Sequence, residues 1–185
     1  MKRAGQIALM FVLMLLASSL VTAQETPVAM PISEHEIVRV LAYGLDVFEP
    51  ALWRMANAED VATDVHVLWR HREQPDLLFF FMHQTYEGRL NAERIAGYYD
   101  DARFEALLVN YLPYEATAEC ERDGLMLYEF SSKQDGVTRI LRYWVRQVGN
   151  QVVLSVNGVT PLAMLDTFED YAARLFPDLP SCEGL

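Results

Sequence analysis

Two arginines and a tryptophan alternate along a segment whose pattern predicts a β-strand. Arg142, Trp144 and Arg146 are spaced two residues apart, so their side chains point to the same face of a strand. Arginine forms paired hydrogen bonds with carboxylates and phosphates, and tryptophan adds a flat apolar surface beside them. Together with Tyr128 from the preceding predicted strand, these residues form our candidate binding site for an acidic or planar group.

The same residues also have a purely structural interpretation. A helix could cover the aromatic side chains of this face while both arginines extend to its rim and pair with surface acids. Guanidinium groups commonly stack on aromatic rings in proteins. The binding groove and the structural face both stay open at this point, because each needs the same residue types at the same spacing.

Histidines and carboxylates suggest an alternative function, an extracytoplasmic hydrolase. His66 and His83 lie on two strands that are expected to pair, so either could work with a carboxylate. The chain has no G-x-S-x-G, S-x-x-K or H-E-x-x-H motif and no glycine-rich phosphate loop. Two histidines without a placed carboxylate also make an incomplete metal site. We therefore expect no catalytic residue, no metal and no cofactor, and we predict a non-catalytic binding or adaptor domain.

The charge balance argues against two classes of partner. The chain has 15 Lys and Arg against 26 Asp and Glu, a formal net charge of −11. A nucleic-acid partner requires a basic face that neutralises phosphates, and anionic membrane surfaces attract basic segments rather than acidic ones. We expect instead an unknown protein or a small anionic ligand in the cell envelope or medium, for which clustered arginines are the anchor.

The first 23 residues have the layout of a secretory signal peptide. A short basic region is followed by an apolar run at 7–16 and by the small-x-small sequence Val21-Thr22-Ala23. The apolar stretch fades within about 15 residues, short of the ~20 needed to cross a bilayer. We predict an exported protein, periplasmic or extracellular, that is cleaved after Ala23 and is then not stably inserted in a membrane. A retained anchor is the alternative.

Two cysteines, Cys120 and Cys182, lie beyond the signal segment. In an oxidising compartment an even pair usually becomes a disulfide. That bridge would attach the C-terminal end to the body of the protein. Two free thiols or a redox pair are the other possibilities, although no C-x-x-C spacing supports a redox role.

The remaining sequence divides into the elements that must position these groups. Residues 24–42 form a lead-in, 43–177 a single α+β domain, and 178–185 a C-terminal tail. The patterns predict a hairpin of 65–71 and 77–84, one kinked helix or two short ones in 91–110, a meander of 125–131, 138–147 and 151–157, and a last helix that begins at Thr160-Pro161. The run at 77–82 is apolar on both sides, which predicts a covering layer on each face.

Alternation along the meander assigns its side chains to two faces. The expected core face carries Leu125, Leu127, Leu141, Tyr143, Val145, Val152, Leu154 and Val156. The other, mixed face carries Met126, Tyr128, Phe130, Ile140, Arg142, Trp144, Arg146, Val153, Ser155 and Asn157.

The order of these features resembles the PsbP/Mog1-like domains of exported bacterial proteins and of the photosystem II extrinsic subunit. The resemblance covers 43–177 and is carried by Tyr43-Gly44-Leu45 with Pro50 and Trp53, by Asp123-Gly124 before the meander, and by Val152-Val153-Leu154 before the last helix. It implies an antiparallel sheet with helices on both faces, an α/β/α sandwich, and a largely non-catalytic, adaptor-like role. It carries over no catalytic residue, and the two cysteines belong to none of these motifs.

We predict that the exported protein begins at Gln24, because the small side chains before it suit a signal peptidase. Loss of Lys2 and Arg3 with the signal leaves 13 basic against 26 acidic residues, a formal charge of −13. N-terminal sequencing of protein recovered outside the cytoplasm measures the cleavage point. Retention of Met1 on a membrane-bound form would show that the segment is an anchor.

Overall fold

A computed structural model of the chain describes residue 44 and residues 46–61 and 64–185, with side chains described in 44, 46–56 and 66–185. The predicted signal peptide, its cleavage site and the lead-in at 24–42 lie outside the described residues. No helix in the described part of the chain is long and apolar enough to cross a membrane.

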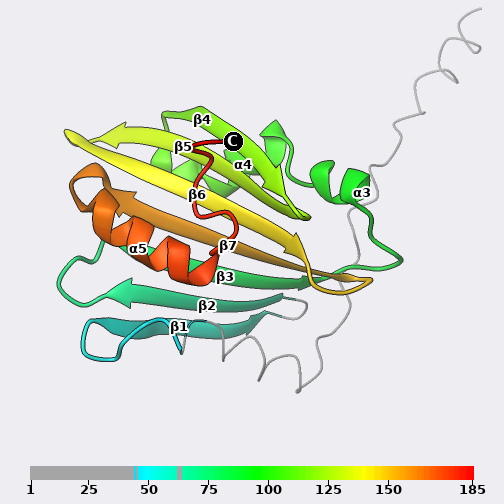
Figure 1. Ribbon diagram of the computed structural model, residues 1–185, viewed down its shortest axis with the longest axis horizontal. Helices are drawn as coiled ribbons and strands as arrows, with labels where there is room; N and C mark the ends of the chain where they lie inside the picture. Colours follow the sequence, from blue (N-terminus) through cyan, green and yellow to red (C-terminus); the bar gives the residue numbers. More distant parts are fainter. Residues whose placement is uncertain (1–43, 45, 62–63) are drawn as a thin grey trace, which may run out of the picture.

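One antiparallel sheet of seven strands forms the centre of the described structure (Figure 1). The strands are β1 (Trp53–Val61), β2 (Asp64–His71), β3 (Leu78–Thr85), β4 (Tyr114–Arg122), β5 (Leu125–Gln134), β6 (Val137–Gln147) and β7 (Val152–Pro161). Their order across the sheet is β1-β2-β3-β7-β6-β5-β4. The predicted α+β class, with a hairpin and a C-terminal meander in one antiparallel sheet, is confirmed.

The two edge strands, β1 and β4, are absent from the prediction. Both contain residues that are depleted in strands: β1 includes Asn, Ala, Glu and Asp, and β4 has three glutamates and two alanines. Most residues of β4 are exposed, so it shows little of the apolar alternation that identifies a half-buried strand. Pairing with β2 and β5, rather than local pattern, makes these segments strands.

Three short helices accompany the sheet in the described residues: α3 (Ala92–Ala96), α4 (Asp101–Leu107) and α5 (Leu165–Leu175). The stretch at 91–110 is thus two short helices, and a 3₁₀ turn, η1 (Val109–Tyr111), follows them. Asn91 caps the first of these helices, since its Oδ1 accepts from the Arg94 amide at 2.8 Å. These elements contain less helix than the α/β/α sandwich that the family resemblance implies.

The last helix does not begin at Thr160-Pro161, as the sequence predicts. Thr160 and Pro161 pair with Ile140 and Arg139 of β6, so the sheet extends through them. A 3₁₀ turn, η2 (Leu162–Met164), comes next, and α5 begins only at Leu165. The ladder hydrogen bonds available at the end of β7 outweigh the local capping signal.

Two hydrophobic clusters pack against the sheet. The first combines Phe48, Trp53, Trp69, Phe79, Phe81, Leu125, Leu127, Trp144 and Val156 with Phe168, Tyr171 and Ala172 of α5. The second combines Tyr128, Phe130, Leu141, Tyr143, Val145 and Val153 with Ile95 of α3 and Phe104 of α4. Because the clusters take alternate residues of β5 and of β6, they lie on opposite faces of the sheet.

The side chains of β6 face the opposite way from the prediction. Leu127 lies opposite Trp144, and Trp144 lies opposite Val156, so these three share a face. Arg142, Trp144 and Arg146 therefore lie with the leucines of β5 that the sequence assigns to the core. Leu141, Tyr143 and Val145 lie on the other face, with Tyr128 and Phe130.

A two-residue turn sets this register. Asp135 and Gly136 both have positive φ, 52° and 78°, and Gln134 pairs with Val137 across them. The hydrophobic pattern of β6 alone does not determine which face is buried with the leucines of β5. Large apolar side chains lie on both faces of this strand, so two registers that differ by one residue would each bury an apolar set.

Gly158 of β7 allows α5 to approach the sheet closely. A Cβ atom at this position would lie 2.6 Å from two ring carbons of Phe168. That ring stacks on Phe79, with the centroids 5.0 Å apart. The missing side chain on β7 thus makes room for the central aromatic residue of α5.

The predicted disulfide is present: Cys120 of β4 is bonded to Cys182, 62 residues further along the chain. Figure 1 shows the C-terminal tail running from the end of α5 across β6 and β5 toward β4. Leu179 of this tail is only 1 % exposed and belongs to the first cluster. The tail is therefore part of the packed structure, and its disulfide agrees with an extracytoplasmic location.

We predict that replacing both cysteines, Cys120→Ser with Cys182→Ser, lowers the free energy of unfolding by about 4 kcal/mol, since the bridge restricts a loop of this length in the unfolded chain. Urea unfolding of the oxidised protein and of the double variant measures the difference. Equal stabilities, or two thiols that alkylate freely in the native protein, would contradict the bridge.

Candidate functional site

Arg142, the first residue of the candidate site, is buried and has all its partners inside the protein. Arg142 is only 3 % exposed to solvent. Nε donates to Glu129 Oε2 and Nη2 donates to Glu169 Oε1, each at 2.6 Å. Nη1 donates to the carbonyl oxygen of Pro180 at 3.1 Å. One guanidinium thus connects β6 to β5, to α5 and to the C-terminal tail.

The environment of Arg142 preserves its charge. Burial alone lowers the pKa of Arg142, but the hydrogen bonds and negative charges of Glu169 and Glu129 outweigh that effect and raise the pKa above its ordinary value. The guanidinium carbon also lies 5.6 Å from the centroid of the Phe168 ring. Two carboxylates already neutralise this cation, so it has little attraction left for an external anion.

Trp144 is part of the first hydrophobic cluster. It is 1 % exposed, and its Nε1 donates to the carbonyl oxygen of Leu179 at 2.9 Å. Its ring stacks on Phe176, with the centroids 4.6 Å apart and the planes inclined by 16°. The helix and the tail cover Trp144, as the structural interpretation expects, but Arg142 is buried beneath them with its carboxylates rather than extended to the rim.

Tyr128 lies on the face opposite the other three candidates. It pairs with Tyr143 and packs against Phe104 of α4, with the ring centroids 4.9 Å apart. Burial, reinforced by the charge of Glu119, raises the pKa of Tyr128 to about 12. A cavity of about 310 Å³ borders Tyr128 between α4 and the β4–β5 edge. The one-residue difference in the β6 register explains why Tyr128 and Trp144 do not meet.

Arg146, the remaining candidate, is half-buried, and no described carboxylate forms an ion pair with it. Its Nε is buried and has no hydrogen-bond partner among the residues that the structure describes. The ion pairs in this part of the chain involve other arginines: Arg139, Arg142 and Arg174. Arg142 and Arg146 are thus four residues apart on one strand, yet in the described part of the chain only the first forms ion pairs.

An apolar cavity of about 250 Å³ opens beside Arg146, on the face that carries α5. Its walls come from β3, β5, β6 and β7, from the end of α5 and from two loop positions: Gly44, Phe81, Leu125, Trp144, Val148, Leu154, Val156, Leu175 and Phe176. Among the described residues of this lining, Arg146 alone is charged. The sequence points to Arg146 through its spacing, but nothing in the sequence reveals the cavity, because its walls come from distant segments.

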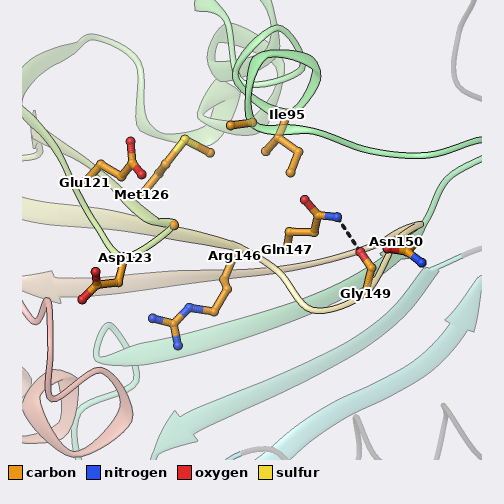
Figure 2. Close-up of a pocket in the computed structure, with 10 residues that line it drawn as sticks. Ile95, Glu121, Asp123, Met126, Arg146, Gln147, Gly149 and Asn150 are labelled. Atoms are coloured by element: carbon orange, nitrogen blue, oxygen red, sulfur yellow. Dashed lines mark hydrogen bonds between the residues drawn. The ribbon is translucent and has the colours of Figure 1, made fainter.

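A second, more polar cavity of about 400 Å³ lies at the same end of the sheet, near the β4–β5 and β6–β7 turns. Figure 2 shows Ile95, Met126 and Gln147 on one side of β6, and the side chain of Arg146 extending on the other side. Arg146 lines both cavities, and it shares the polar one with the carboxylates of Glu121 and Asp123, neither of which forms an ion pair with it in the described structure.

The two histidines of the alternative hydrolase site do not come together. His66 lies opposite Met82, whereas His83 lies opposite Val65, so the two side chains point to opposite faces of the sheet. The ring of His66 packs against Phe80, at 5.2 Å between centroids. Within the described residues no group of three or more His, Cys, Asp or Glu side chains could hold a metal ion. His35 lies outside these residues.

The fold defines an α+β protein with one seven-stranded antiparallel sheet. No family model and no curated protein matches the sequence. Among solved structures, the chain is similar to the crystal structure of LpqN, which is involved in cell envelope biogenesis of Mycobacterium tuberculosis. The two share 15% identity over 69% of this chain and 76% of LpqN, with a TM-score of 0.44.

We predict that Arg142→Met lowers the free energy of unfolding by about 3 kcal/mol, because it leaves Glu129 and Glu169 close together without their cation. Chemical denaturation at neutral pH measures the loss. Arg139→Met is the matched control on the same strand, since Arg139 pairs with an exposed carboxylate, that of Asp76, at 3.1 Å. The control should change stability by about 1 kcal/mol or less. Similar losses in both variants would contradict the central role of Arg142.

Proposed function

We propose that this protein is an exported, non-catalytic binding domain that captures an anionic ligand at Arg146. In this proposal a single domain at 43–177, with its tail to residue 185, follows a signal peptide that is cleaved after Ala23. The domain is a divergent relative of the PsbP/Mog1-like family. The disulfide supports export, because such bonds persist in oxidising compartments.

The observation that carries the proposal is the contrast between Arg142 and Arg146. Removing a cation from water costs free energy unless a negative group compensates for it. Arg142 has two carboxylates within 2.6 Å, whereas none of the described carboxylates forms an ion pair with Arg146. An external anion would supply the missing charge.

The shape of the site favours a small ligand over a protein surface. Arg146 borders a cavity that is enclosed by the sheet and by the end of α5, and such concave sites bury most of a small molecule's surface. Arg142 and Trp144 serve this site indirectly in the proposal. The first holds α5 and the tail in place, and the second provides a wall of the cavity.

We predict that native mass spectrometry of the mature protein, isolated gently from its own cell envelope, detects a bound small acid. Arg146→Gln should lose this species, because the neutral amide cannot balance an anion. Arg139→Gln should keep it, since Arg139 lies on the other face of β6 and pairs with Asp76. A wild-type protein without any bound acid, or equal occupancy in wild type and Arg146→Gln, would contradict anion capture at this residue.

A further inference from the structure

The cavity beside Arg146 combines one positive charge with otherwise apolar walls. Leu125, Arg146 and Leu154 lie opposite one another on three neighbouring strands, and they form one row of side chains across the sheet. The next row, deeper under α5, consists of Leu127, Trp144 and Val156. The guanidinium therefore lies toward the strand end, and the apolar walls extend inward from it.

The end of α5 closes the inner part of this cavity. Leu175 is the last residue of the helix. Phe176 follows it and stacks on Trp144, with the ring centroids 4.6 Å apart. On the outer side, Val148 is exposed at the rim. A ligand would thus have its charged group near the rim and its apolar part against the aromatic floor.

We propose that the ligand is an amphipathic carboxylic acid whose acyl chain occupies the apolar cavity and whose carboxylate pairs with Arg146. This inference rests on the proposed function, because it identifies the ligand class of the same site. A single guanidinium balances one negative charge, and no other charged residue lines the cavity within the described part of the chain. A carboxylate therefore suits the site better than a doubly charged phosphate.

The size of the cavity limits the acyl chain. Its volume of about 250 Å³ is less than the roughly 300–1,000 Å³ of typical small-molecule sites, which argues for a medium-length chain rather than a complete membrane lipid. Each methylene group that leaves water strengthens binding by about fourfold. Chain length should consequently dominate affinity, while the carboxylate orients the ligand.

The test is a calorimetric titration of the mature protein with octanoate, acetate and 1-octanol at the same ionic strength. We expect octanoate to bind at least 100-fold more tightly than acetate, since acetate lacks the chain that fills the cavity. It should also bind at least 10-fold more tightly than 1-octanol, which lacks the charge. Nuclear Overhauser contacts between the octanoate methyl group and the rings of Trp144 and Phe176 should locate the chain.

Three variants separate the contributions of charge and cavity. Arg146→Gln should weaken octanoate at least 10-fold and leave 1-octanol unchanged, whereas Leu154→Phe, which fills the cavity, should weaken both. Arg139→Gln should bind octanoate like the wild type. If Leu154→Phe does not fold, judged by near-ultraviolet circular dichroism, the wild-type comparison of octanoate with acetate still decides the question.

The possible results distinguish this inference from the proposed function. If octanoate and acetate bind with equal affinity and both lose binding in Arg146→Gln, the proposed role of the acyl chain is overturned and anion capture at Arg146 stands. If the protein carries another bound acid but does not bind octanoate, the acyl-chain proposal is also overturned while anion capture stands. Octanoate binding that does not depend on Arg146 would overturn the pairing proposed here, and a protein without any bound acid would contradict both proposals.

Discussion

The buried charge of Arg142 must be balanced inside the protein, and this requirement connects segments that are distant in sequence. Glu129 comes from β5, Glu169 comes from α5, and the carbonyl of Pro180 comes from the tail. A buried guanidinium that loses such partners costs several kcal/mol, so α5 and the tail have one favoured position on the sheet. The disulfide attaches the same tail to β4. The positions of α5 and the tail on this face of the sheet thus depend on balancing the charge of Arg142.

The cavity beside Arg146 is a consequence of that arrangement. The helix and tail cover the part of β6 around Arg142 and Trp144, and α5 ends at Leu175, before the row of side chains that contains Arg146. The second arginine is therefore held by the same strand but receives no carboxylate from the covering elements. Because the walls around it are fixed by the packing of the first cluster, a ligand would meet a site that needs little rearrangement.

Local patterns predict the elements that depend mainly on neighbouring residues. The hairpin formed by β2 and β3, the three meander strands and the disulfide all agree with the sequence analysis. The edge strands β1 and β4 do not, since hydrogen bonds to distant strands define them while few apolar residues identify them. The start of α5 also differs, because pairing with β6 extends β7 through Thr160-Pro161.

Some features of the candidate site follow from the local sequence, and others follow only from tertiary packing. Alternation alone determines that Arg142, Trp144 and Arg146 share a face, because the two-residue period of a strand holds in any register. Which face that is depends on the turn at Asp135-Gly136 and on how the neighbouring strands pair. The pairing with β5, which places Glu129 opposite Arg142 and Leu125 opposite Arg146, and the packing of α5 together decide which arginine is neutralised. Two chemically identical side chains differ in role because a charge is satisfied by groups close in space, and those groups come from remote parts of the chain.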